Sequence, residues 1–407
     1  MTPAAAAKHY RRGTHRTRSP AETVARFGVH ARALGVTRLA NVTGLDYLGI
    51  PVFMSIRPNS RSLSVSQGKG VDDDAAMASA LMETIELAHA ENLPRPARKE
   101  SYRQIKARVR TADPALLPRL KRRPLPMDAP IAWTRGENLA DGGEIWVPYD
   151  LVHTDFASLA RRRQDAFFCS SNGLASGNHL TEAICAALYE VIERDATALW
   201  TLRDRRSRPE RRLVLASVRD PLCRNLLDRL AASGMTVAVW DVTTDIGVAA
   251  FSCRINEAPG NDRSNLRAFW GAGCHLSREI ALLRAVTEAA QSRLTYIAGS
   301  RDDLYRRYYE ETQGAPLIAE VHEMWESALA RRKFDDVPSE AGASFEADRD
   351  LVLAKLRRAG LTQAVAVDLS DARYGIPVVR VIVPGLEYDP EYTRSAPGPR
   401  ARAAAEG

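Results

Sequence analysis

The chain has 407 residues, of which 45% are hydrophobic and 26% are charged. This composition is typical of a soluble globular protein, and the length allows a large core. No stretch is long and apolar enough to span a membrane, and no apolar segment follows the basic residues near the start, so we expect a cytoplasmic protein that does not contact a membrane. The formal net charge of +7 is spread along the chain without interleaved aromatic residues, which favours a solvated surface over nucleic-acid binding.

One order of elements occurs three times along the chain. In each case a predicted helix ends at a glycine, an apolar strand follows, and an aspartate lies in the turn before a second strand. The pairs are Gly35 and Asp46, Gly234 and Asp245, and Gly360 and Asp371. Glycine at these positions favours a left-handed helix end. Tight turns between consecutive strands leave no room for parallel crossovers, so three helix-strand-strand units predict an α+β fold with mainly antiparallel sheets.

We interpret residues 1–390 as a single composite domain. Its core covers about residues 60–390, and an N-terminal segment precedes this core. The tail over residues 391–407 has a turn and disorder composition and is predicted to be flexible.

The first of three predicted helices with a polar face follows the acidic residues 72–74 and contains Ser79, Glu83 and Glu86. Aspartates favour a helix N-terminus, and the three polar residues share one face. Like charges three residues apart repel each other, and no Lys or Arg lies three or four residues from either glutamate. A bound cation would remove this repulsion.

Two later helices show a similar polar face. One starts near Thr181, and the other extends from about Arg278 to Tyr296, with apolar residues on other sides of both helices. The polar residues are Glu190, Glu193 and Arg194 in the second helix and Arg284, Glu288 and Gln291 in the third.

Taken singly, each helix is best interpreted as a solvated face with an i,i+4 salt bridge. Together, the two Glu-x-x-Glu pairs favour a site for hard cations held by oxygen ligands, with phosphates completing the coordination, which fits Mg²⁺ with ATP. The chain has no GxxxxGK[ST] loop, so the sequence does not indicate a P-loop fold. Lys69 lies between two glycines just before the first helix, where it either meets a phosphate or belongs to a simple turn.

Three weaker candidates have structural alternatives. Residues 170–178, rich in Ser, Gly and Asn, either bring backbone close to a ligand or form a plain loop. Cys274 and His275 are adjacent, so in a strand they point to opposite faces, which favours a core cysteine over a nucleophile–base pair. His89 and Glu91 do not have a zinc-binding spacing, and the five cysteines lack a CxxC pair, so we predict reduced core cysteines and no transition metal.

These motifs together resemble the nucleotide-binding signatures of the YcaO family. The signatures are Ser79-x-x-x-Glu83-x-x-Glu86, Glu190-x-x-Glu193-Arg194 and Glu288-x-x-Gln291. Further segments resemble, in the same order, the branch of the family associated with TfuA proteins: Ile50-Pro-Val, residues 57–70, residues 170–178, and Gln291-Ser-Arg-x-Thr through Gly299-Ser-Arg-Asp-Asp303. The resemblance covers roughly residues 8–400, and such joint spacing is more specific than any one motif.

The resemblance implies a YcaO-type fold with ATP and Mg²⁺ as cofactors. The expected metal ligands are Glu83, Glu86, Glu190 and Glu193. The expected contacts to the nucleotide or to the metal ligands come from Ser79, Arg194, Arg284, Glu288 and Gln291, with Lys69 as a further candidate. Arg16 and Thr23 occupy places where family members have a basic residue and a hydroxyl for ATP. The candidate catalytic residues are Glu83, Glu193, Arg194 and Arg284.

The resemblance also implies the chemistry. A nucleophile adds to a backbone carbonyl of a peptide or protein, ATP phosphorylates the resulting oxyanion, and phosphate leaves to give an azoline or a thioamide. Azoline-forming members often end in Pro-x-Pro-x-Pro, whereas this chain has Pro397 and Pro399 without a third proline at that spacing, and no fused domain for capturing a leader peptide is evident. Both features favour a thioamide, with sulfide delivered by a TfuA-like partner.

Two alternatives stay open. One is an azoline-forming cyclodehydratase that acts on Cys, Ser or Thr of a ribosomal peptide, and the other is a non-catalytic ATP-binding adaptor. In either case we expect a homodimer.

Overall fold

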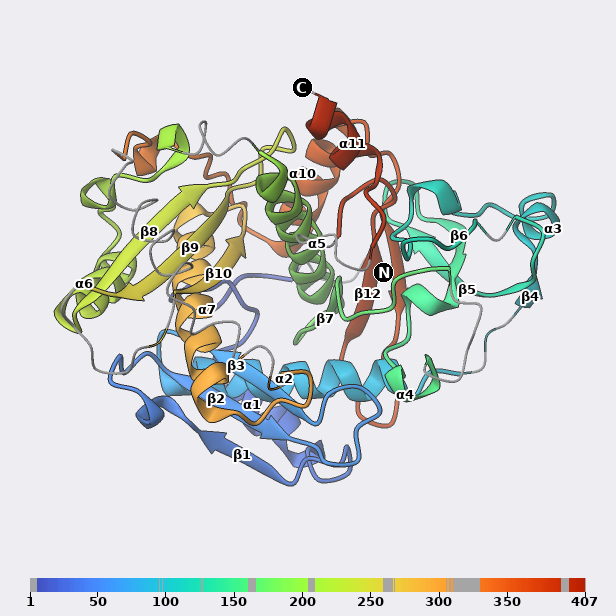
Figure 1. Ribbon diagram of the computed structural model, residues 1–407. Coiled ribbons are helices and arrows are strands. Elements are labelled where there is room, and N and C mark those ends of the chain that lie inside the picture. Colours follow the sequence, from blue (N-terminus) through green and yellow to red (C-terminus); the bar gives the residue numbers. More distant parts are fainter. Residues whose placement is uncertain are drawn as a thin grey trace.

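The computed structural model describes residues 6–406 apart from 95, 97, 126, 160–165, 204–208, 259–265, 267, 305, 307–308, 310–329 and 389–394. Its strands form three antiparallel sheets around three long helices (Figure 1). The long helices are α2 (Asp73–Glu91), α5 (Leu180–Leu202) and α7 (Arg278–Ala298). The predicted α+β fold with mainly antiparallel sheets is confirmed.

The N-terminal sheet has the strand order β1-β2-β3 and lies at the bottom of Figure 1. Helix α1 (Pro20–Phe27) precedes it, and α2 follows its last strand and packs on β2 and β3. The strands are β1 (Arg38–Asn41), β2 (Val52–Ile56) and β3 (Val65–Lys69).

The second sheet has the order β10-β9-β8 and lies at the left of Figure 1. Helix α6 (Pro221–Ala232) precedes it, and α7 follows β10 and packs on β10 and β9. The strands are β8 (Met235–Asp241), β9 (Ala250–Glu257) and β10 (Phe269–Cys274).

The third sheet combines segments that are far apart in the sequence. Its order is β4-β5-β11-β12-β7, and β6 pairs with β5. Helix α10 (Phe345–Arg358) precedes β11 (Val365–Asp368) and β12 (Val378–Ile382), whereas β7 (Leu174–Ser176) precedes α5. A lobe at the right of Figure 1 extends this sheet and contains β4 (Arg98–Glu100), α3 (Tyr102–Lys106), β5 (Ile131–Asn138) and β6 (Gly143–Pro148), and the short helix α4 (Phe156–Leu159) follows it in the chain.

All three sheets share one succession of elements: a helix, three antiparallel strands and a long helix. The succession is continuous in the first two sheets, but in the third it passes from β12 to β7, which lies earlier in the sequence. Gly35, Gly234 and Gly360 each lie just before the first strand of a succession and have φ angles of 87°, 73° and 82°. This is the left-handed conformation that the sequence predicted for these glycines.

Glycines let two long helices approach their sheets closely. A Cβ atom on Gly68 of β3 would lie 2.0 Å from the backbone nitrogen of Ala80 in α2. A Cβ atom on Gly271 of β10 would lie 2.3 Å from the backbone nitrogen of Ala289 in α7. Both positions therefore require glycine because a methyl group would overlap the helix backbone.

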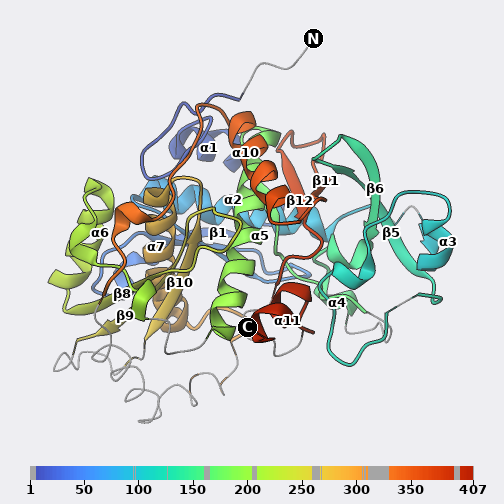
Figure 2. The same cartoon turned by 90° about the horizontal axis from the view of Figure 1, so that it is seen from above.

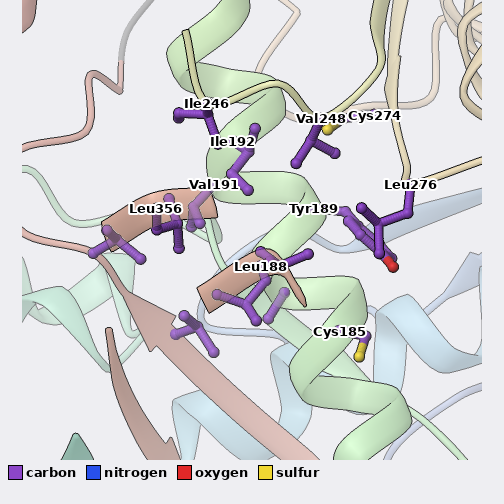
Figure 3. Close-up of a cluster of buried hydrophobic side chains, with 14 of the residues drawn as sticks. Cys185, Leu188, Tyr189, Val191, Ile192, Ile246, Val248, Cys274, Leu276 and Leu356 are labelled. Carbon is purple, nitrogen blue, oxygen red and sulfur yellow. The ribbon is translucent and has the colours of Figure 1, made fainter. Parts of the chain in front are cut away.

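Helix α5 is buried on several sides (Figure 3). Leu188 and Ile192 pack in a cluster with Val248, which lies just before β9, and with Leu356 of α10. A helix with apolar residues on most of its circumference is typical of a buried helix. The few polar residues of α5 therefore stand out as candidates for a site.

The C-terminal residues correct the expectation of a flexible tail over 391–407. Pro399–Glu406 form helix α11, which packs against α5 (Figure 2). The Arg400 Nε lies 3.0 Å from Asp195 Oδ1 on α5, and its guanidinium also contacts Asp245. The turn residues before Pro399 dominated the composition, although the Ala- and Arg-rich segment after it favours a helix. Among the described residues, the structure contains no helix that is both long and apolar enough to cross a membrane.

Replacing Gly68 tests the close packing of α2 on β3. Gly68→Ala is expected to lower the free energy of unfolding by about 3 kcal/mol, because the new methyl group forces the helix away from the strand. Gly44→Ala is the control, since a Cβ atom there meets nothing within 4 Å, and a change below about 0.5 kcal/mol is expected. Urea unfolding curves measure both values, and equal losses in the two variants would contradict this account.

Candidate functional site

A cavity of about 940 Å³ lies where α2, α5 and α7 face one another. This volume is at the upper end of the ~300–1,000 Å³ typical of small-molecule sites. All of the site residues predicted from the sequence line it: Arg16, Thr23, Lys69, Ser79, Glu83, Glu86, Glu190, Glu193, Arg194, Arg284, Glu288 and Gln291. The structure thus brings the predicted residues together, and their individual roles stay predictions.

Backbone amides hold four of the glutamates in place. Each of these side chains accepts a hydrogen bond from an N–H group of a strand. The pairs are Gln67 N to Glu83 at 3.2 Å, Ser176 N to Glu86 at 2.8 Å, Cys274 N to Glu193 at 2.9 Å and Ala272 N to Glu288 at 3.3 Å. The Ser176 hydroxyl also donates to Glu86, at 2.7 Å.

The donors lie on the outer edges of the three sheets. Among the described residues, β3, β7 and β10 are each the last strand at one side of their sheet. In an antiparallel pair, every second residue points its N–H group away from the partner strand. The donors hold these outward positions, so carboxylates from the long helices occupy edges where another strand would otherwise pair.

Cationic side chains lie between the carboxylates. Lys69 Nζ is 2.6 Å from Glu288 Oε2, and Arg284 Nη2 is 3.6 Å from Glu193 Oε2. Although burial opposes ionisation, Lys69 and Arg194 hold the pKa of Glu288 below its usual value. The Arg284 Nε is buried and has no hydrogen-bond partner within the described residues, so it can donate to an anionic ligand.

At Glu86 and Glu190 the effect of burial on the carboxyl pKa outweighs the effect of the nearby positive charges. Burial raises the pKa of Glu86 to about 8, helped by the charges of Glu83 and Glu190 and opposed by the hydrogen bonds from Ser176. Burial also raises the pKa of Glu190 to about 7, which Arg194 partly opposes. Both carboxyl groups therefore retain protons near neutral pH unless more positive charge is present.

This donor set fits Mg²⁺. Hard cations prefer carboxylate oxygens, and Mg²⁺ commonly shares one or two carboxylates with the phosphates of a nucleotide. The predicted metal ligands Glu83, Glu86, Glu190 and Glu193 supply such oxygens from α2 and α5. Burial is the main cause of the raised pKa values of Glu86 and Glu190, and additional positive charge would offset it. A divalent cation would supply that charge.

The N-terminal segment closes one side of the cavity. Thr17 donates from its N–H and hydroxyl groups to Glu182 at 2.9 and 2.7 Å, and Arg16 Nε lies 3.7 Å from the same side chain. The Asn178 amide donates to the hydroxyl of Thr23 at 2.8 Å. Residues 170–178 thus do approach the cavity, through Ser171 and residues 174–178.

A buried cluster anchors this N-terminal segment. His15, His275 and Asp348 could together present metal ligands. However, the Lys8 ammonium lies 2.5 Å from Asp348, and Tyr189 donates to the same oxygen at 3.1 Å. Burial lowers the pKa of His15 to about 4 and lowers that of His275 as well, so both rings are neutral. The cation of this cluster is therefore Lys8, and the cluster acts as an anchor.

Cys274 is a core residue, as predicted. Its side chain is fully buried, burial raises the pKa of its thiol, and its backbone N–H orients Glu193. All five cysteines are free, and only Cys169 is not fully buried.

Sequence reasoning did not select several residues of the cavity wall, among them one arginine and one tryptophan. Arg301 follows α7 and Trp270 lies on β10, and both line the cavity. Arg301 was noted only as part of a motif, and its position just after a helix with site residues was the available signal. Trp270 gave no comparable signal in the sequence, and 43% of its surface is exposed.

The raised pKa values predict how stability depends on pH without Mg²⁺. Above the usual carboxyl pKa the folded state still holds protons on Glu86 and Glu190 that the unfolded chain has released. Glu86 and Glu190 therefore each contribute a fall in the free energy of unfolding between about pH 5 and pH 8, of up to ~1.4 kcal/mol per pH unit. His15 and His275 oppose this fall below about pH 6.5, because the unfolded chain protonates them and the folded state does not. Glu86→Gln and Glu190→Gln should each reduce the slope, and saturating Mg²⁺ should do the same. Urea unfolding at stepped pH, with EDTA or with Mg²⁺, measures this, and a pH dependence in both variants identical to that of the unaltered protein would refute it.

Comparison with known proteins identifies the family of the chain. Residues 67–387 match the family described as YcaO cyclodehydratase, ATP- and Mg²⁺-binding. A protein in the tfuA 3′ region of Rhizobium leguminosarum bv. trifolii is 39% identical over 382 residues, which covers 91% of this chain and 88% of that protein.

Two solved structures share the fold. YcaO from Methanopyrus kandleri, bound with AMPPCP and Mg²⁺, has a TM-score of 0.75 at 24% identity and covers 97% of this chain and 98% of that one. A heterocyclase in complex with substrate and cofactor also has a TM-score of 0.75, at 22% identity, covering 95% of this chain and 54% of that chain. The chain therefore belongs to the YcaO family, whose cofactors are ATP and Mg²⁺.

Proposed function

We propose that this protein uses Mg-ATP to phosphorylate a peptide backbone amide oxygen and installs a thioamide, with a sulfur nucleophile delivered together with a TfuA-like partner. The observation that carries the proposal is the convergence of the two Glu-x-x-Glu pairs with Lys69 and Arg284 in one cavity. The similarity to a protein in a tfuA 3′ region supports the choice of partner and nucleophile. The expected homodimer stays a prediction.

The residues of the cavity suit phosphoryl transfer. Bound Mg-ATP supplies the phosphoryl group and positive charge beside the glutamates. Glu83, Glu86, Glu190 and Glu193 hold the cations, and edge amides keep Glu83, Glu86 and Glu193 oriented. Arg284 is free to donate to a phosphate oxygen through its unpaired Nε. Pre-oriented charges of this kind stabilise a transition state without reorganisation during the reaction.

The overall reaction balances without an oxidant or a reductant. Sulfide adds to the amide carbon, and the carbonyl oxygen becomes negatively charged. That oxygen takes the phosphoryl group, and the carbon–oxygen bond then breaks, so the products are a thioamide, phosphate and ADP. The protein must keep water away from the phosphoryl group until the amide oxygen attacks.

The mouth of the cavity supports a peptide as the substrate. Ala272 and Cys274 point their N–H groups to the outer edge of β10. By the same alternation, the N–H and carbonyl groups of Trp270 point to this edge. Because the N–H groups of Ala272 and Cys274 already donate to Glu288 and Glu193, an extended peptide would pair with this edge at Trp270, where the exposed indole also offers an apolar contact for a side chain.

An azoline-forming cyclodehydratase is the second candidate, favoured by the family description and by the heterocyclase with the same fold. Mass spectrometry separates the two. After treatment of a candidate peptide with the protein, its TfuA-like partner, Mg-ATP and sulfide, exchange of oxygen for sulfur adds about 16 Da, whereas cyclisation removes about 18 Da as water. We expect the gain, and a loss of water would replace thioamide formation with cyclisation.

Removing a metal-binding carboxylate tests the site itself. Glu193→Gln and Glu83→Gln are each expected to weaken binding of Mg-AMPPCP at least about 10-fold, because a neutral amide is a poorer ligand for Mg²⁺. Glu279→Gln is the control, because Glu279 lies on α7 but does not line the cavity, and it accepts hydrogen bonds from Ser277 and Ser339. Isothermal titration calorimetry gives the affinities. Unchanged binding in both site variants would remove the basis of the proposed function, and binding without peptide-dependent phosphate release would indicate an adaptor.

A further inference from the structure

Arg301 lies on a loop that three contacts hold beside the cavity. Gly299 ends α7 in a left-handed conformation with φ = 58°, and its N–H donates to Thr295. The Ser300 hydroxyl contacts the sulfur of Met54 on β2, and the Asp302 carboxylate accepts from the Ser64 N–H at 3.2 Å. The loop therefore has a fixed place between α7 and the N-terminal sheet.

The guanidinium of Arg301 pairs within its own loop. Its Nε and Nη2 lie 2.8 and 2.5 Å from the oxygens of Asp303. The Arg301 side chain is 24% exposed and that of Asp303 is 44% exposed. Water reaches the pair from the Asp303 side and screens it, and a phosphate offers the same two-point geometry as the carboxylate, so Arg301 can exchange Asp303 for a phosphate.

Arg301 lies outside the three long helices, yet its charge acts on the predicted metal site. It lines the cavity, and its charge opposes the effect of burial on the pKa of Glu83 more than any other charge does, ahead of Lys69. Arg301 is thus a cation close to a predicted metal ligand, with a guanidinium that can bind two phosphate oxygens at once.

The position of Arg301 relative to the two ends of β10 indicates which part of a nucleotide Arg301 would contact. At one end of β10, the ring of His275 contacts His15 of the N-terminal segment. At the other end, Phe269 contacts Tyr296, in the last turns of α7 just before the Arg301 loop. Arg301 therefore lies at the Trp270 end of the cavity. Under the proposed function the peptide binds beside Trp270, and the terminal phosphoryl group of ATP must face the amide of that peptide.

We propose that Arg301 leaves Asp303 when Mg-ATP binds and contacts the terminal phosphoryl group, as a further catalytic residue of the phosphoryl transfer. This inference rests on the proposed function, because it assumes that ATP binds between the three helices. A bidentate contact from outside those helices would stabilise the charge on the phosphoryl group at the side where the amide attacks.

Calorimetric titration with two nucleotides tests the contact. Arg301→Gln is expected to weaken Mg-AMPPCP binding about 10- to 100-fold and Mg-ADP binding less than about 3-fold, because ADP lacks the γ-phosphoryl group that Arg301 would contact. Arg301→Lys, which keeps the charge but loses the bidentate geometry, should give an intermediate loss for Mg-AMPPCP. Arg349→Gln on α10, where Arg349 pairs with the exposed Asp350, is the matched control and should change neither affinity.

Each other outcome overturns the proposal. Equal losses for both nucleotides would mean that Arg301 shapes the site in general, and no loss would mean that it serves another ligand. Tighter binding would mean that Arg301 only competes with Mg²⁺ for Glu83. Asp303→Asn is the control for misfolding of the loop. This substitution frees Arg301, so Mg-AMPPCP binding should be equal or tighter. A large loss of affinity would also count against the contact. If the unaltered protein binds neither nucleotide, the proposed function itself fails, which is a different result from an insensitive Arg301 variant.

Discussion

Hydrogen bonds from the outer edges of three sheets to buried glutamates are the interaction on which the rest of the structure depends. Each edge N–H group would be a liability if it stayed unpaired, and each carboxylate would be costly to bury alone. A hydrogen bond between the N–H group and the carboxylate removes both costs. It also fixes the direction of the carboxylates, because the sheet behind each donor is rigid, so the site is oriented before any ligand arrives.

These contacts need helices that lie very close to strands. Gly68 and Gly271 allow that approach, and the alanines that face them on α2 and α7 leave room for the backbone of the strand. The apolar clusters around α5 then hold the third helix in the same position relative to its sheet. The packing and the chemistry are therefore coupled, since a helix displaced by one methyl group would withdraw its glutamates from the edge amides.

Much of the site could be predicted from the sequence, because side chains on one face of a helix leave a periodic pattern. Glu83 with Glu86 and Glu190 with Glu193 were found in this way, and the structure brings them to one cavity. The amide donors could not be found, because a backbone N–H leaves no mark in the sequence at Ala272 or Cys274. Helix α11 was missed for another reason: its contacts to Asp195 and Asp245 join residues more than 150 positions apart, and local composition does not report them.

The divided third sheet has a consequence for how the protein is made on the ribosome. Helix α5, which carries Glu190 and Glu193, leaves the ribosome well before β12, yet β7 in front of it pairs with β12 through Ser176 and Val378, 202 positions later. Until the C-terminal third has been synthesised, the apolar sides of α5 lack their cover, and the nascent chain exposes a surface that favours aggregation. Glu190 and Glu193 on α5 therefore reach their final position only after β12 has been synthesised. The sheets that pack against α2 and α7, by contrast, are each continuous in the sequence.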